Sequence, residues 1–369
     1  MIFDRAVVAF RADASLAIGS GHVMRCLTLA DSLKAQGAEC FFICREHSGN
    51  LISHIKTRGY KVYVLCCIDE PPMPSGGLAH SEWLCSTQQR DANDCISFLA
   101  SCNVDWLIVD HYALDSSWER LLKKYCKKLM VIDDLADREH ACDLLVDQNL
   151  GRTPSDYDGL VPTKCKIFAG AQYSLLRPEF ETLREYSLGR RGISSLKKIL
   201  ITMGGVDQFN VTGQVLKALK QCSFPTDTSI TVVMGATAPW IDQVKMLAFE
   251  MPWVTEVLVG ISDMAQKMAD SDLAIGAAGS TSWERCCLGL PTLMVVLADN
   301  QISIANELSK FGAAAILSSP GNPDFVTSLK MHTTALLNDS LAFRAMQLSA
   351  SAITSGGGCS IISKYMLPS

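Results

Sequence analysis

The sequence predicts an α/β protein made of two doubly wound units, each with a parallel sheet covered by helices on both faces. Short apolar runs alternate with segments of helical periodicity, and this alternation stops at a polar stretch over 189–195 and then restarts. Near-continuous apolar strands separated by helices are typical of a parallel sheet that is buried on both faces. The length of 369 residues is also more than one core usually supports.

The first unit begins with an apolar run over 6–11, which predicts a strand. A helix is expected next, over 22–36, because Val23, Leu27, Ala30 and Leu33 recur at helical spacing and Gly37 follows. A segment rich in Pro and Gly over 71–77 predicts a loop, and 152–178 is rich in turn residues. Further strands are expected at 40–44, 61–65, 106–109 and 129–132, with helices at 91–101 and 116–124.

The second unit repeats the same alternation without a detailed repeat of sequence. We expect strands at 198–202, 230–234, 254–258, 273–275 and 292–296, and a helix over 212–220. The domains are therefore expected at 1–188 and 189–350, joined by a linker at 189–195. Helices are expected beyond Ser318, and 351–369 is expected to form a C-terminal segment that packs back on the first domain.

Composition excludes several classes of protein. The chain is 48% hydrophobic and 19% charged, as in ordinary globular domains, and its net charge of −5 offers no basic surface for nucleic acid. The 15 cysteines form no Cys-x-x-Cys pair, so we expect reduced, mostly buried thiols rather than disulfides or a structural zinc site. The N-terminus does not resemble a signal peptide, and no apolar run approaches the ~20 residues that span a bilayer. A soluble cytoplasmic protein without a membrane partner is expected.

Polar residues follow the predicted strands, where open α/β sheets bind their ligands. They are Arg11, Asp13 and His22 after the first strand, then Asp110, His111 and Tyr112, Asp133 and Asp134, Gly204 and Gly205, residues 276–281, and Asp299, Asn300 and Gln301.

The segment Gly19-Ser20-Gly21-His22 places an imidazole where a Gly-rich turn enters a helix. His22 is either a general base or a polar residue that caps the helix. The turn lacks the third glycine of a dinucleotide-binding fingerprint, which disfavours a dehydrogenase.

Two Gly-rich turns in the second half are candidate phosphate sites. Gly204 and Gly205 precede a helix and could bind a diphosphate through backbone N–H groups, or form a plain turn capped by Asn210 or Thr212. Gly279-Ser280-Thr281 precedes a helix that carries Glu284. That carboxylate would suit a ribose diol, or it could simply favour the helix dipole.

Other candidates have plain structural interpretations. His111 could be a second acid or base, although a polar histidine at a strand end is more often structural. Asp133-Asp134 and Asp156-Tyr157-Asp158 could hold a metal ion, but the second motif lies in a turn-rich loop and such short matches are common. We favour no metal.

Several motifs, taken together and in order, resemble one family. They are Arg11-Ala-Asp13, Gly19-Ser-Gly21-His22-Val-Met-Arg25, Val109-Asp110-His111-Tyr112, Ile132-Asp-Asp134-Leu-Ala-Asp-Arg, Gly170-Ala-Gln-Tyr-Ser-Leu-Leu-Arg177, Met203-Gly-Gly, Gly279-Ser-Thr-Ser-Trp-Glu284 and Asn300-Gln301. The pattern resembles the UDP-2,4-diacetamido-2,4,6-trideoxy-β-L-altropyranose hydrolases of pseudaminic acid biosynthesis. This resemblance implies a GT-B fold with two Rossmann-like domains facing a cleft. It also implies inverting hydrolysis of a UDP-sugar to UDP and the free sugar, without a metal or other cofactor.

The resemblance also implies roles for individual residues. His22 matches the general base that activates water, and Tyr112, Asn300 and Gln301 match the sugar site. The turn formed by Gly279, Ser280 and Thr281, together with Glu284, matches the nucleotide-binding turn, and the Gly204, Gly205 and Asn210 turn matches a phosphate-side loop. Arg11, Asp13 and Gly21 are expected near the substrate, with Asp13 either orienting His22 or binding a sugar hydroxyl. A transferase with another acceptor and a non-catalytic nucleotide-sugar-binding protein remain as alternatives.

Overall fold

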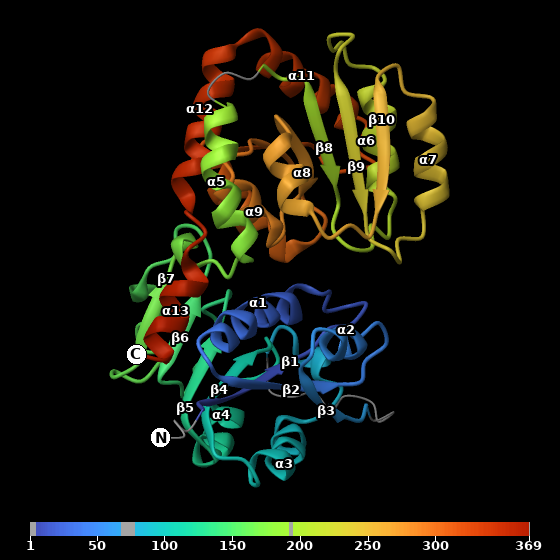
Figure 1. Ribbon diagram of the computed structural model, residues 1–369. Coiled ribbons are helices and arrows are strands. Elements are labelled where there is room, and N and C mark those ends of the chain that lie inside the picture. Colours follow the sequence, from blue (N-terminus) through green and yellow to red (C-terminus); the bar gives the residue numbers. More distant parts are fainter. Residues whose placement is uncertain (1–4, 68–77, 192–194, 369) are drawn as a thin grey trace. The chain divides into compact units, whose positions relative to one another are not determined.

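Two all-parallel sheets organise the chain in a computed structural model that describes residues 5–67, 78–191 and 195–368 (Figure 1). One unit comprises residues up to Leu175 together with those from Gly357 onward, and the second comprises Leu176–Gly356. Each unit is a Rossmann-like α/β structure, so the predicted fold class is confirmed.

The first unit contains a seven-stranded sheet in the order β3-β2-β1-β4-β5-β6-β7. Alternate residues of its interior strand β1 face opposite sides, so Val8 and Phe10 pack with helices α1, α2 and α13 while Ala9 packs with α3 and α4. The strands are β1 (Val7–Ala12), β2 (Glu39–Arg45), β3 (Lys61–Leu65), β4 (Val104–Asp110), β5 (Cys126–Ile132), β6 (Leu144–Asp147) and β7 (Lys166–Ala169). The helices are α1 (Gly21–Ala35), α2 (Ile52–Thr57), α3 (Gln88–Leu99), α4 (Ser116–Leu122) and α13 (Gly358–Met366).

The C-terminal helix α13 belongs to the first unit. The indole Nε1 of Trp106 donates to the carbonyl of Met366 at 3.1 Å, and Ser32 Oγ donates to Ser363 Oγ at 3.0 Å. Gly358 begins the helix so close to the chain that a Cβ would lie 2.4 Å from the Ser174 carbonyl oxygen. A glycine is therefore required where the chain returns to this unit.

The second unit contains a six-stranded sheet in the order β10-β9-β8-β11-β12-β13. Ile199 and Ile201 of β8 pack in a core with α6, α7 and α11. The strands are β8 (Lys198–Thr202), β9 (Ser229–Met234), β10 (Val254–Val259), β11 (Leu273–Ala277), β12 (Thr292–Val295) and β13 (Ala314–Ile316). The helices are α5 (Pro178–Arg191), α6 (Val211–Leu219), α7 (Ile241–Phe249), α8 (Met264–Asp270), α9 (Thr281–Cys287), α10 (Ile302–Lys310), α11 (Phe325–Asn338) and α12 (Ser340–Ile353).

The division at 175/176 differs from the expected one at 188/189. Helix α5 lies in the second unit because Arg190 pairs with Asp272 at 2.8 Å and Arg191 donates to the Leu288 carbonyl at 2.8 Å. The helix also continues through Arg191, into the stretch expected to be a linker. At the other end, residues up to Gly356 remain with the second unit, and those from Gly357 onward join the first.

The strands β6, β7 and β13, of three or four residues each, were not predicted. The Pro- and Gly-rich loop expected at 71–77 lies outside the described residues. The 15 cysteines all lie within the described part of the chain and form no disulfide. Among the described residues, no helix is both long enough and apolar enough to cross a membrane.

Candidate functional site

His22 lies in the first turn of α1 and is paired with a carboxylate from the neighbouring strand. Helix α1 follows β1 in the chain. Strand β1 pairs with β4, whose last residue is Asp110. His22 Nδ1 lies 2.5 Å from Asp110 Oδ1. Burial alone would raise the pKa of Asp110, but the charge of Arg25 and the hydrogen bonds from Arg25 and His22 hold that pKa well below its ordinary value. Asp110 is therefore an ionised acceptor, so Nδ1 carries the proton and Nε2 is left with the lone pair.

Arg25 holds this carboxylate in place. It lies one turn after His22 on α1, and its Nε and Nη2 both donate to Asp110 at 2.6 Å. Its Nη1 pairs with Asp134 Oδ2 at 2.5 Å, and the Tyr112 hydroxyl donates to the same oxygen at 2.6 Å. The flanking carboxylates raise the pKa of Arg25 above its ordinary value against the effect of burial. The guanidinium thus remains charged and fixes both carboxylates.

Aromatic rings surround the imidazole of His22. The Tyr112 ring meets it edge-on at 4.5 Å between centroids, and the Trp83 ring lies at 6.3 Å. Trp83 also stacks on Tyr112 at 5.8 Å and on His80 at 4.2 Å. These rings leave His22 only 8% exposed. Such an environment limits access of bulk water and strengthens the His22–Asp110 interaction.

Arg11 and Asp13 form a separate, fully buried ionic network. Arg11 donates two hydrogen bonds to Asp91, at 2.7 and 3.1 Å, and pairs with Asp13 at 2.6 Å. Asp13 Oδ2 lies 3.2 Å from His111 Nε2, and no hydrogen bond or ion pair among the described residues joins Asp13 to His22. Both side chains are fully buried in this network, and their expected contact with a substrate stays a prediction. The hydrogen-bond partner of His22 is Asp110.

His111 has a structural place. Its Nδ1 accepts a hydrogen bond from the backbone N–H of Ala113 at 3.2 Å, so the proton sits on Nε2 beside Asp13. Burial lowers the pKa of His111, which keeps the ring neutral. Of the two interpretations of this residue, the structural one is favoured.

The loop after β8 in the second unit presents open backbone at Gly204 and Gly205. A Cβ at either residue would meet no atom within 4 Å, and Gly204 has a φ of +88°. Gly235, after β9, packs so closely on this loop that a Cβ there would lie 1.9 Å from the Gly205 carbonyl oxygen. The loop is therefore packed against Gly235, while the Cβ positions at Gly204 and Gly205 are unobstructed.

The start of helix α6, just after this loop, is already capped. Asp207 accepts hydrogen bonds from the backbone N–H groups of Val211 and Thr212 at 2.8 and 2.9 Å, and Asn210 accepts from Gly213 at 3.1 Å. These bonds satisfy the free N–H groups that an anion would otherwise use. The structural interpretation of Asn210 as a helix cap is therefore favoured over phosphate binding by this helix end.

The turn before α9 is different, because its polar groups are largely unengaged. Gly279 faces open space, Ser280 is exposed and makes no capping hydrogen bond, and Thr281 accepts from Arg285 Nη1 at 3.3 Å. Glu284 is half-buried, and none of the side-chain hydrogen bonds or ion pairs found among the described residues involves its carboxylate. Burial raises the pKa of Glu284 to about 7, although Arg177 and Arg285 oppose this shift. A half-buried carboxylate without a partner is suited to accept hydrogen bonds from a ligand.

The remaining predicted residues lie near these loops or begin their helices. Gly21 is the first residue of α1, and Asn300 lies in the 3₁₀ helix Asp299–Gln301 that precedes α10. Gln301 uses its side-chain oxygen to accept from the backbone of Leu297 at 3.0 Å. That side chain therefore shapes its own loop.

The aspartates considered as metal ligands are engaged by the protein. Asp133 pairs with Arg138 at 2.8 Å, and Asp134 with Arg25. Asp156 accepts from the Thr153 backbone at 2.7 Å and caps a short 3₁₀ helix. None of these aspartates belongs to a group of three metal-ligating side chains among the described residues.

Several contributors to the site were missed from the sequence. Asp110 was identified only as part of a motif, and Arg25, Trp83 and Gly235 were given no role. The signal for Asp110 was the adjacency of β1 and β4 at the centre of a doubly wound sheet, where the strand order reverses. Trp83 offered no signal, because it follows no predicted strand and belongs to none of the motifs.

Comparison with known proteins supports the resemblance found in the motifs. Residues 199–352 match the glycosyltransferase family 28 C-terminal domain. The chain is 28% identical over 306 residues to the UDP-2,4-diacetamido-2,4,6-trideoxy-beta-L-altropyranose hydrolase of Campylobacter jejuni, covering 83% of this chain and 97% of that protein. The predicted resemblance to this hydrolase is thereby confirmed.

Two further curated relatives match over part of their length. MJ1062 of Methanocaldococcus jannaschii is 27% identical over 80% of this chain, and the spore coat polysaccharide biosynthesis protein SpsG of Bacillus subtilis is 30% identical over 40%. The chain spans 56% of the first and 43% of the second, or about half of each.

Solved structures identify the fold. MurG of Acinetobacter baumannii superposes with a TM-score of 0.72 at 16% identity, over 98% of this chain and 99% of that one. The spinosyn rhamnosyltransferase SpnG, solved with thymidine diphosphate, superposes with a TM-score of 0.62 at 14% identity, over 98% and 99%. At these identities the likeness shows the GT-B type of fold and no more.

Proposed function

We propose that this protein is an enzyme that hydrolyses a UDP-sugar at the anomeric C–O bond, with His22 as the base that activates water. The observation that carries the proposal is the His22–Asp110 pair, with Nδ1 and Oδ1 2.5 Å apart inside an aromatic pocket. Support also comes from the similarity to the Campylobacter hydrolase, which extends over nearly the whole of that protein.

The protonation of His22 suits a general base. Asp110 accepts the proton of Nδ1, so the lone pair on Nε2 is available to take a proton from water. As the imidazole becomes positively charged, the buried carboxylate of Asp110 stabilises it. Arg25 fixes Asp110 with two hydrogen bonds, which keeps the pair aligned without movement during the reaction. Attack by this water from the side opposite UDP would invert the anomeric configuration.

The second unit is proposed to hold the UDP. Glu284 would accept hydrogen bonds from the ribose hydroxyls, because it lacks a partner and lies in the first turn of α9. The open backbone at Gly279, and at Gly204 and Gly205, would approach the diphosphate. Donors placed there would stabilise the charge that develops on the leaving UDP.

The sugar is proposed to be 2,4-diacetamido-2,4,6-trideoxy-β-L-altropyranose, the sugar in the name of the Campylobacter relative. This would place the reaction in pseudaminic acid biosynthesis. Tyr112 and Asn300 are proposed to line the sugar site. The reaction as proposed uses no metal ion, because the base is an imidazole and the leaving group carries its own charge-stabilising oxygens.

The test is UDP release from the UDP-sugar in the absence of any acceptor. We expect the wild-type protein to release UDP and His22→Ala to lose this activity while still binding the nucleotide sugar. Near-normal turnover by His22→Ala would contradict the assignment of the base. A match of residues 199–352 to a glycosyltransferase domain favours one second candidate, a transferase with an acceptor other than water. Such an enzyme would release UDP only when that acceptor is supplied.

A further inference from the structure

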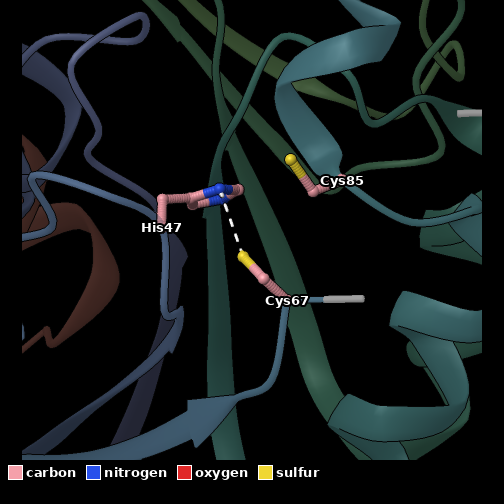
Figure 2. A group of neighbouring side chains, drawn as sticks. All are labelled: His47, Cys67 and Cys85. Carbon is pink, nitrogen blue, oxygen red and sulfur yellow. Dashed lines mark hydrogen bonds between the residues drawn. The ribbon is translucent and has the colours of Figure 1, made fainter. Parts of the chain in front are cut away.

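Three side chains from separate loops of the first unit converge on one point. His47 follows β2, Cys67 follows β3, and Cys85 follows the 3₁₀ helix η1 (Ser81–Leu84). Their ligand atoms all lie within 4.8 Å of one another, and His47 Nδ1 is 3.6 Å from Cys67 Sγ. Figure 2 shows both sulfur atoms facing the imidazole of His47. None of the three is used in the proposed hydrolysis.

The spacing fits a tetrahedral metal ion. Zinc binds thiolate sulfur at about 2.3 Å and imidazole nitrogen at about 2.0–2.1 Å, with angles of about 109°. Those values place the nitrogen about 3.6 Å from each sulfur and the two sulfurs about 3.8 Å apart. The observed distance of 3.6 Å between His47 Nδ1 and Cys67 Sγ equals the nitrogen–sulfur distance of such a site.

His47 is oriented as a ligand by its second nitrogen. Nε2 lies 3.4 Å from Asp13 Oδ2, and Arg11 keeps Asp13 ionised. A proton on Nε2 therefore faces the carboxylate, and Nδ1 keeps its lone pair toward the sulfurs. A carboxylate behind the imidazole is the usual arrangement at metal-binding histidines, where it fixes the tautomer and makes the ligand more basic.

The two cysteines are held at the same point by the backbone. The buried Arg45 donates through Nη1 to the carbonyl of Cys66, which fixes the chain just before Cys67. Cys85 has a φ of +48°, a left-handed conformation that is costly for a residue with a Cβ. That conformation ends the 3₁₀ helix η1 and determines where its side chain leaves the backbone.

We propose that His47, Cys67 and Cys85 bind a Zn²⁺ ion, with water or an exogenous ligand in the fourth position. Binding releases the protons of the two thiols to solvent, so two thiolates balance the charge of the ion. The sequence predicted no structural zinc site, because it contains no Cys-x-x-Cys motif. The proposed ligands come instead from three separate loops.

The ion would tie η1 to the ends of β2 and β3. This helix carries Trp83, whose ring lies 6.3 Å from His22 and stacks on Tyr112. Zinc would therefore fix one wall of the His22 pocket without contacting the reacting atoms. This role is structural, and metal binding itself is independent of the proposed hydrolysis.

The test is metal content and affinity of the full chain, purified reduced and then titrated with Zn²⁺ and Co²⁺. We expect one ion per chain, with a sulfur-to-cobalt charge-transfer band. We expect Cys67→Ser and Cys85→Ser to weaken binding by at least the ~10–100-fold that loss of a ligand's hydrogen-bond partner causes. Cys66→Ser is the matched control, because Cys66 is exposed and adjacent but outside the cluster.

Three results would contradict the proposal. They are no stoichiometric metal in the wild type, as much metal in Cys67→Ser and Cys85→Ser as in the wild type, or as great a loss in Cys66→Ser as in those two variants. A Cys67–Cys85 disulfide in protein purified without oxidant, detected by mass spectrometry, would also replace the metal site. Circular dichroism checks that each variant is folded. Hydrogen exchange over residues 80–86 should slow when Zn²⁺ binds, and unchanged exchange would remove the role in fixing Trp83.

Discussion

Replacing Asp110 with Asn tests the pair at the centre of the proposed site. The substitution keeps the size of the side chain but removes the charge that accepts the Nδ1 proton of His22 at 2.5 Å. An amide can also donate, so it can hold His22 with the proton on the wrong nitrogen. The lone pair would then point toward residue 110 rather than toward water.

The size of the effect follows from what the pair supplies. A positioned general base contributes about 10²–10⁴ in rate. We therefore expect Asp110→Asn to lower kcat by about 10²–10⁴, or about 3–5 kcal/mol of transition-state stabilisation. KM should change little, because Asp110 is fully buried and binds no substrate in this account.

The assay is steady-state UDP release, with thermal unfolding measured in parallel. Asp134→Asn is the matched control, since Asp134 also pairs with Arg25 at 2.5 Å but makes no contact with His22. Both variants should lose stability, because each leaves Arg25 with one buried carboxylate instead of two. Only Asp110→Asn should lose most of its turnover, and combining it with His22→Ala should add little. A kcat for Asp110→Asn close to that of Asp134→Asn would exclude Asp110 as the residue that holds His22 in its active tautomer.

Three further predictions concern the second unit and the stability of the first. Because the pKa of Glu284 is raised to about 7 and the bound form requires its carboxylate, UDP-sugar affinity by calorimetry should fall up to about tenfold per pH unit below 7. Glu284→Gln should bind the UDP-sugar more weakly than the wild type does. If the affinity of this variant still falls at low pH, the pH dependence belongs to another group. Gly279→Ala should unfold like the wild type but bind UDP at least about tenfold less tightly, because the added methyl group would keep the diphosphate from the backbone N–H and a hydrogen bond to a charged group would be lost. Gly276→Ala is the contrasting variant and should destabilise the fold, since its Cβ would lie 2.8 Å from Arg285. Unchanged UDP affinity in Gly279→Ala would exclude the loop before α9 from the UDP site. Finally, burial and the charge of Asp134 raise the pKa of Asp147 to about 7. The protonated Asp147 therefore stabilises the folded protein fully below about pH 4, and this stabilisation is lost as pH rises through 7. Asp147→Asn should therefore raise the melting temperature relative to the wild type more at pH 8 than at pH 5, and the opposite order would contradict the shift.

The architecture could be predicted from the sequence because long apolar strands alternate with helices in both halves. The strands at 61–65 and 198–202 were predicted with the bounds that the structure gives. Short strands escaped prediction, as with Ala314–Ile316, because three residues cannot show a periodicity. Residues 176–188 were assigned to the first domain, whereas the structure places them in the second unit, since the contacts of Arg190 and Arg191 cannot be seen along the chain.

The candidate site was predicted in part. The sequence indicates which residues follow the strands, but the direction of each side chain depends on the pleat and on the opposing helix. Arg11 follows Phe10 on β1 and so faces the other side of the sheet, where Asp91 of α3 binds it. The partner of His22 required the order of strands, which the sequence does not specify. The group formed by His47, Cys67 and Cys85 required the positions of three loops.

Hydrolysis in H₂¹⁸O tests the central claim most directly. The wild-type protein is given UDP-2,4-diacetamido-2,4,6-trideoxy-β-L-altropyranose with no acceptor, and the products are followed by NMR and mass spectrometry. The account predicts ¹⁸O at the anomeric carbon of the free sugar, inverted configuration at first release, and unlabelled UDP. It also predicts that His22→Ala forms neither product. Label in the UDP phosphate, or no UDP without an acceptor, would contradict it.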